Sequence, residues 1–167
     1  MRAVLICLAV LSLAACATVQ RLPAAGDVHA LLIAIRDNDQ AKFDSLVDRR
    51  ALDRQIGSIL VEKVAAKDSK YGALASLLAP SLAKQAGDMF IQPEVFHAVA
   101  EHYGYTSATK IPNIIYIAQA LRPLPDGRVC AMTKKDGPCL LDFTKAPDGH
   151  WKLSGFEGDV SMLRLKR

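Results

Sequence analysis

The spacing of the apolar residues changes once along this 167-residue chain, and that change limits the fold more than any other feature. Between Asp27 and Gly104, apolar side chains recur three and four positions apart, as they do on one face of an α-helix. After Pro112 they alternate, which is the spacing of a strand with one buried face. This order predicts an α+β fold, with N-terminal helices packed on one face of a C-terminal antiparallel β-meander.

Capping residues and helix breakers divide the helical part into segments. We expect Asp27, Asp39 and Asp48 each to cap the start of a helix, because a carboxylate there accepts a backbone N–H that has no partner within the helix. Pro80 should either kink its helix or begin a new one, and Pro93 suits the first turn of the next helix.

Three Asp-Gly pairs, at residues 126–127, 136–137 and 148–149, predict the turns of the meander. In the third expected strand, Cys139 and Phe143 fall on the apolar face and Asp142 falls on the polar face. The last twelve residues can form an edge strand or a tail. The strands are expected near residues 114–122, 128–134, 139–144 and 151–156.

The N-terminus has the three parts of an export signal: Arg2, an apolar stretch over residues 3–13, and small residues before Cys16. The apolar stretch is shorter than the roughly 20 residues that cross a bilayer, so we expect no permanent transmembrane anchor. Leu13-Ala14-Ala15-Cys16 resembles the lipobox of bacterial lipoproteins. The resemblance implies cleavage before Cys16, acylation of Cys16 with palmitate-like chains, and a protein anchored in the envelope.

Two other outcomes stay open for Cys16. Ordinary signal peptidase can cut after the Ala15-Cys16-Ala17 triplet, which would release a soluble periplasmic protein. Cys16 can also be a buried thiol of an intact N-terminal helix. If the lipobox is used, Ala17 in place of Asp suggests the periplasmic side of the outer membrane, by analogy with lipoprotein sorting in enteric bacteria.

These segments define the expected organisation of the chain. Residues 1–15 are the predicted lipoprotein signal peptide, and residues 16–26 are the lipidated tether. Residues 27–104 and 105–167 are the helical and β-meander parts of one globular domain. The counts of 21 basic and 17 acidic residues are nearly balanced, so we expect no nucleic-acid partner.

The cysteines favour an oxidising compartment. Cys7 leaves with the signal and Cys16 is modified, which leaves Cys130 and Cys139 as a pair on either side of a predicted turn. We therefore expect a disulfide across a hairpin, with closure of the loop contributing roughly 2–3 kcal/mol. Their spacing is neither that of a zinc site nor the C-x-x-C of a redox centre.

Three stretches carry a resemblance to a known family: "AIRDNDQAKFDSLVDRRALDRQI", "FIQPEVFHAVAEHYG" and "WKLSGF". They resemble the uncharacterised bacterial envelope family called domain of unknown function twenty-nine thirty-nine. That family has no established activity, so the resemblance implies no catalytic residue. The order of helices and then a curved sheet also resembles the cone-shaped folds related to nuclear transport factor two, which often enclose an apolar pocket.

No catalytic, cofactor-binding or metal-binding set is predicted. Glu94, His97 and Glu101 share one helix face, but a di-iron site needs two such motifs. Asp48 can be a catalytic carboxylate or a helix cap, and we favour the cap. His150 in a turn is typical of an ordinary exposed histidine.

The sequence therefore predicts a non-enzymatic lipoprotein that faces the periplasm and binds a small apolar ligand or lipid. Its pocket would lie between helices and sheet and be lined by Leu78, Phe96, Ile115 and Trp151. The alternative is a protein-interaction or structural accessory of an envelope complex, which predicts an exposed apolar patch instead. A hydrolytic enzyme is the least favoured possibility. Membrane lipid is an expected partner of the anchor in either case.

Overall fold

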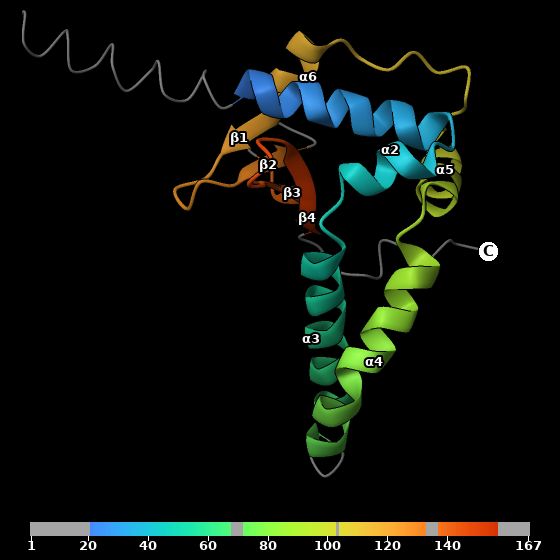
Figure 1. The fold of residues 1–167 in the computed structure, drawn as a ribbon, viewed down its shortest axis with the longest axis vertical. Coiled ribbons are helices and arrows are strands. Elements are labelled where there is room, and N and C mark those ends of the chain that lie inside the picture. The colour runs from blue at the N-terminus through green and yellow to red at the C-terminus, as the bar shows by residue number, and fades with distance from the viewer. Residues whose placement is uncertain (1–20, 68–71, 103, 133–136, 157–167) are drawn as a thin grey trace, which may run out of the picture. The chain divides into compact units, whose positions relative to one another are not determined.

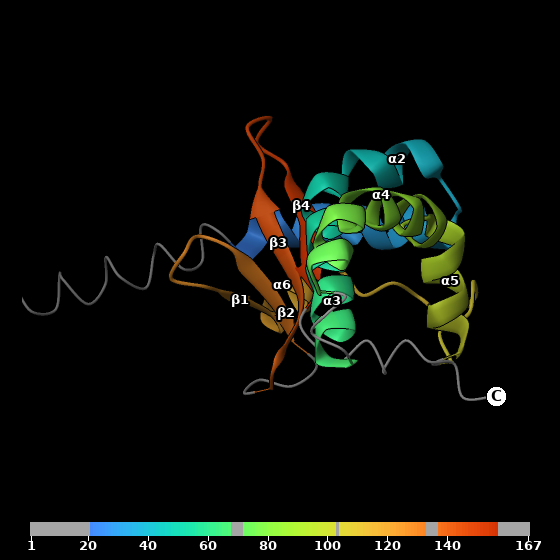
Figure 2. The ribbon, with the colours of Figure 1, turned by 90° about the horizontal axis from the view of Figure 1, so that it is seen from below.

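The computed structural model describes residues 21–67, 72–102, 104–132 and 137–156. Helices precede a four-stranded antiparallel sheet, so the predicted α+β class is confirmed (Figures 1 and 2). The predicted signal, Cys16 and the residues after Phe156 lie outside the described part. Residues 21–36 are helical, followed by α2 (Gln40–Ser45), α3 (Arg49–Lys67), α4 (Gly72–Phe90), α5 (Pro93–His102), α6 (Ile114–Ala120), β1 (Leu121–Pro123), β2 (Val129–Met132), β3 (Cys139–Lys145) and β4 (Trp151–Phe156).

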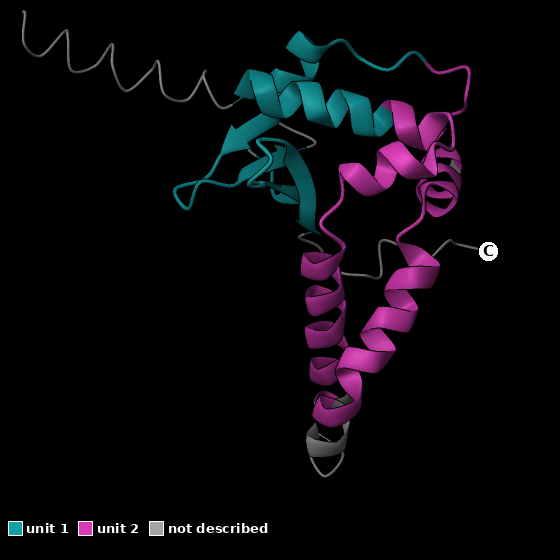
Figure 3. Cartoon of the chain, viewed as in Figure 1, with its two compact units in different colours: residues 1–32, 110–158 teal, residues 33–109, 159–167 magenta. Residues whose placement is uncertain are grey.

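The chain forms two compact units (Figure 3). Unit 1 is Met1–Leu32 with Lys110–Gly158, and within its described residues it holds most of the first helix, α6 and the sheet. Unit 2 is Ile33–Thr109 with Asp159–Arg167, and it holds α2 to α5. The expected single domain over residues 27–167, like the cone shape, stays a prediction.

The first helix begins before Asp27, which is therefore not its N-cap. Ala24 and Ala25 are fully buried, so residues 21–26 of the expected tether belong to the folded helix. Asp27 lies inside the helix, and its carboxylate accepts the Trp151 backbone N–H over 2.7 Å and contacts His150 Nδ1 at 3.0 Å. The carboxylate thus joins this helix to the start of β4 instead of capping it.

The other predicted helix starts are confirmed. Asp39 accepts the backbone N–H of Lys42 at 2.9 Å, and Asp48 accepts that of Ala51 at 3.0 Å. The Asp48 carboxylate is therefore used as a cap. Pro93 is the first residue of α5, where its missing N–H costs no hydrogen bond.

Small residues line the contact between α3 and α4. A Cβ at Gly57 would lie 3.4 Å from Ala83 Cβ, whereas one at Gly87 would lie only 2.0 Å from Asp53 Oδ1. Glycine at position 87 therefore gives the Asp53 carboxylate the room it occupies. α4 continues through Pro80, so of the two alternatives predicted there, a kink or a new helix, the new helix was wrong.

The sheet is the expected meander, in the order β1-β2-β3-β4. The prediction of a strand from residue 114 was wrong, because residues 114–120 form α6. Asn113 caps this helix by accepting the Tyr116 N–H at 3.1 Å, and Ile117 is its buried residue. The cap and one buried face outweigh the β-propensity of the isoleucines. The strand itself begins at Leu121.

Two of the three Asp-Gly turns lie wholly within the described residues, and both are formed. Gly127 and Gly149 have φ of 85° and 89°, a conformation that glycine adopts without strain. Asp136 lies outside the described part. The predicted polar side of β3 needs one correction, because Asp142 is only 3% exposed.

Candidate functional site

Cys130 on β2 and Cys139 on β3 form a disulfide, with their Cα atoms 5.6 Å apart. The predicted pairing is thus confirmed. The bond crosses the two strands diagonally, since Cys130 lies opposite Asp142 and Cys139 lies opposite Met132. Both cysteines are buried, at 0% and 5% exposure, so the bond is a crosslink inside unit 1.

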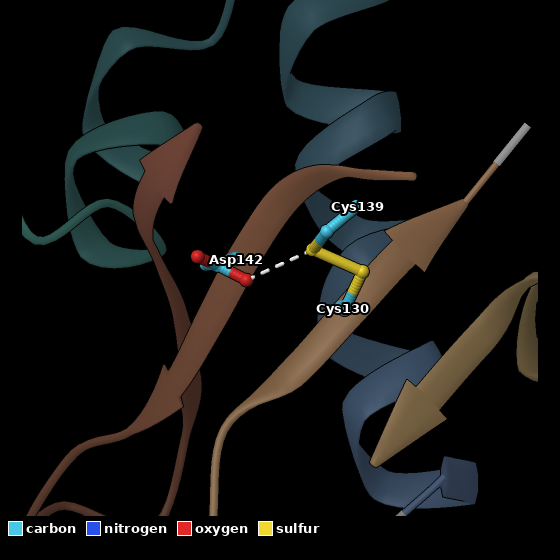
Figure 4. Close-up of side chains that lie close together, drawn as sticks. All are labelled: Cys130, Cys139 and Asp142. Atoms are coloured by element: carbon cyan, nitrogen blue, oxygen red, sulfur yellow. Dashed lines mark hydrogen bonds between the residues drawn. A yellow bond between two sulfur atoms is a disulfide. The ribbon is translucent and has the colours of Figure 1, made fainter. Parts of the chain in front are cut away.

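Asp142 lies beside this disulfide and points toward it (Figure 4). Its Oδ1 is 3.1 Å from Cys139 Sγ, and its Oδ2 is 2.5 Å from Nη1 of Arg128. Arg128 also donates from Nε to Asp126 over 2.7 Å, and this hydrogen bond is the main reason that the pKa of Asp126 is lowered. The guanidinium therefore balances the buried charge of Asp142 and bonds to the turn before β2.

This cluster combines three groups of the kinds that bind metals. Ligand atoms of Cys130, Cys139 and Asp142 all lie within 4.8 Å of one another. Metals bind thiolates, however, and the oxidised pair offers none. In the disulfide form the arrangement acts as a crosslink beside a partly buried ion pair, in which Asp142 is buried and Arg128 is partly exposed. Sequence reasoning missed Asp142 because strand alternation alone placed it in solvent.

The four predicted pocket residues lie in different units. Leu78 and Phe96 belong to unit 2, and Ile115 and Trp151 belong to unit 1. Leu78 is 48% exposed and Ile115 is 64% exposed, whereas Trp151 is buried at 3%. Phe96 packs edge-on against Phe43, with ring centroids 5.4 Å apart. A pocket that contains all four stays a prediction.

A groove of about 590 Å³ lies between α3 and α4, within unit 2. None of the four predicted residues lines it. Its lining includes Gly57, Ala79 and Ala83, all buried, with the charged Arg54 and Lys84 also among the lining residues. Three of the lining residues are thus the small ones at which the two helices approach each other closely.

α4 also carries an exposed apolar stripe, which we define as Leu78, Leu82 and Met89. Their exposed fractions are 48%, 49% and 65%. Their spacing of four and seven residues places them on one face of the helix. The buried residues Ala79 and Ala83 face away from the stripe, toward α3. The stripe is thus apolar surface that unit 2 leaves uncovered.

The candidate acid and histidine residues of α5 lie on its surface. Glu94 accepts a hydrogen bond from Asn38 at 3.0 Å, and that bond is the main cause of the lowered pKa of Glu94. His97 Nδ1 is 3.9 Å from Glu101 Oε1, a loose contact between neighbouring turns. The helix face predicted from the sequence is present, and its described contacts are those of a solvated surface.

A family model described as "Protein of unknown function (DUF2939)" matches residues 8–99, more than half of the chain. The chain belongs to the DUF2939 family. The match covers the first of the three stretches that suggested a family and most of the second, and it ends within α5, before the sheet.

DUF2939 membership assigns no role to any residue, because the family is described as one of unknown function. No curated protein and no solved structure matches the chain. Among the described helices, none combines the length and the apolar character that a membrane span requires.

Proposed function

We propose that the mature chain is a non-enzymatic, lipid-anchored envelope protein whose unit 2 binds a partner protein through the stripe on α4. The observation that carries this proposal is the exposure of Leu78, Leu82 and Met89 along one helix face. Fully burying an aliphatic side chain contributes about 1.5–3 kcal/mol. Because three side chains are each about half exposed or more, burying them under a partner would contribute several kcal/mol to the free energy of binding.

The charge of the two helices indicates what kind of partner fits. α3 has five basic and two acidic residues, and α4 has one of each, so together they carry six positive and three negative charges. A partner of opposite charge would be attracted and correctly oriented. The favoured occupant is an acidic amphipathic helix of another envelope protein, laid along the stripe.

Site-specific photocrosslinking in intact cells tests this proposal. A crosslinker at Leu82 should give one discrete adduct, whereas a crosslinker at Lys84, which is exposed two residues further along α4 and therefore on a different face from Leu82, should not. Met89→Glu in the Leu82 background should abolish the adduct. Equal adducts from both positions would contradict a specific surface, and an adduct of twice the chain mass would identify a second copy in place of a different protein.

Binding of a small apolar ligand or lipid is the second candidate, and the α3–α4 groove favours it. Its volume of about 590 Å³ falls in the range of about 300–1,000 Å³ for ligand sites. A fatty acid with a fluorescent acyl chain is a suitable probe. Binding that Ala83→Leu abolishes, while Leu82→Ser leaves it unchanged, would favour this function over partner binding.

The proposed address is the periplasmic side of the envelope, with Cys16 as the lipidated first residue and the outer membrane as the favoured location. The Cys130–Cys139 disulfide supports an oxidising compartment. Fractionation of cells that express the parent chain and a Cys16→Ala variant tests the anchor. The parent should remain with membranes after a high-salt wash, and a variant retained equally well would refute the lipid anchor.

A further inference from the structure

We infer that unit 1 docks on the lipid bilayer through the start of α6, so that Ile115 and Tyr116 contact lipid. This inference rests on the proposed lipidation of Cys16 and goes beyond it, because an anchor alone does not fix which surface faces the membrane. The occupant of the surface is the bilayer to which the chain would be attached.

The length of the tether is the first part of the argument. Five Cα-to-Cα steps separate Cys16 from Arg21, where the described helix begins. Fully extended, they span at most about 18 Å. The helix over residues 21–36 is itself about 24 Å long at 1.5 Å per residue. Unit 1 therefore cannot move far from the membrane, and one of its faces must lie close to the lipid.

The distribution of exposed apolar side chains identifies that face. Among the described residues of unit 1, the large apolar side chains that are exposed are Leu22, Ile114, Ile115 and Tyr116, at 48%, 40%, 64% and 66%. Leu22 lies just after the tether. The other three are consecutive at the start of α6, on the same side of the sheet as the first turns of the helix over residues 21–36 (Figure 1).

The chemistry of this segment suits the boundary between lipid and water. Tyrosine is enriched there because its ring is apolar and its hydroxyl is polar. Lys110, exposed a few residues before α6, can reach anionic headgroups. Insertion of a few apolar side chains adds to the lipid anchor, since membrane attachment that uses two signals is firmer than attachment by one.

Fluorescence quenching by brominated lipid tests the docking. The acylated full chain carries one tryptophan, Trp151, which is buried in β4. We would compare it with Tyr116→Trp and with a control, Lys145→Trp, reconstituted in vesicles of brominated phosphatidylcholine and phosphatidylglycerol. Position 145 is exposed at the end of β3. It lies four residues along β3 from Leu141, which is level in the sheet with Leu121, the first residue after α6.

The signal of the parent chain, which comes from Trp151, is first subtracted. The fluorescence of the tryptophan in Tyr116→Trp should then be quenched and its emission maximum should shift to the blue. The tryptophan in Lys145→Trp should show neither change. Adding Ile115→Glu to Tyr116→Trp should reverse the quenching. Two outcomes would overturn the docking and leave the proposed function standing. One is equal quenching at the two positions. The other is no quenching at position 116 in a chain whose mass shows that it is acylated. A chain without acyl groups would overturn the proposed function itself.

Discussion

Reduction of the Cys130–Cys139 disulfide should destabilise unit 1 by an amount that follows from the size of its loop. The bond closes ten residues, from position 130 to 139, and the chain-entropy relation gives about 2.7 kcal/mol at 25 °C for a loop of that size. A reduced Cys139 thiol can donate to Asp142, whose Oδ1 is 3.1 Å away. We expect this hydrogen bond to offset part of the lost stability, so that reduction lowers the free energy of unfolding by about 2 kcal/mol.

Urea and thermal unfolding followed by Trp151 fluorescence measure this loss, since Trp151 is the chain's one tryptophan and lies in the same sheet. For a chain of this size, about 2 kcal/mol corresponds to a fall of roughly 4–8 °C in the unfolding midpoint on adding dithiothreitol. The control is a Cys130→Ser, Cys139→Ser variant, whose midpoint should not respond to the reductant. An unchanged midpoint in the parent chain, or an equal response in the control, would refute the reasoning.

Three further expectations concern packing and charge. Gly87→Ala should lower the free energy of unfolding by about 1 kcal/mol, because its methyl group would lie 2.0 Å from Asp53 Oδ1 on α3. The cost of displacing that carboxylate, about 1–3 kcal/mol, exceeds the helix-propensity gain of about 1 kcal/mol. Gly57→Ala should instead raise the free energy of unfolding by about 0.5–1 kcal/mol through helix propensity. Urea unfolding followed by circular dichroism compares the two variants. Equal effects on the free energy of unfolding would contradict the described packing of α3 against α4. Asp27→Ala should lower the free energy of unfolding by about 1–3 kcal/mol, because it leaves the first N–H of β4 without its carboxylate acceptor. An unchanged unfolding midpoint, followed by tryptophan fluorescence, would be evidence against that hydrogen bond. Burial acts to raise the pKa of Asp44, but hydrogen bonds from neighbouring side chains and the charge of Arg49 outweigh it and lower the pKa below 3.8. The stability that ionised Asp44 contributes is therefore complete at neutral pH and is lost as the pH falls through the lowered pKa. Acidification should thus lower the unfolding midpoint of the parent chain more than that of Asp44→Asn. Equal losses of stability in the two chains would contradict the lowered pKa of Asp44.

The sequence predicted the features that depend on local chemistry. Asp39 and Asp48 cap helices because a carboxylate at that position satisfies a backbone N–H whatever the helix packs against. The disulfide followed from counting the cysteines that remain after export, and the Asp-Gly turns from the positive φ that glycine permits. These signals need no knowledge of tertiary structure.

The features that sequence reasoning missed depend on distant partners. Asp27 matched a cap signal, but it lies inside a helix because residues 21–26 are already helical. Its carboxylate bonds instead to a strand more than a hundred residues away. Asp142 is buried although alternation places it in solvent, since Arg128 balances its charge. For α6, the isoleucines suggested a strand, and the Asn113 cap was the local signal that could have corrected the prediction.

The proposed start of the mature chain is an acylated Cys16, and the mass of the N-terminal peptide tests it most directly. Membranes from cells that express the full chain should yield, after proteolysis, a peptide that starts at position 16 and carries the mass of a diacylglyceryl group or of three acyl chains. A peptide that starts at Met1 or at position 18, or an unmodified Cys16, would contradict it.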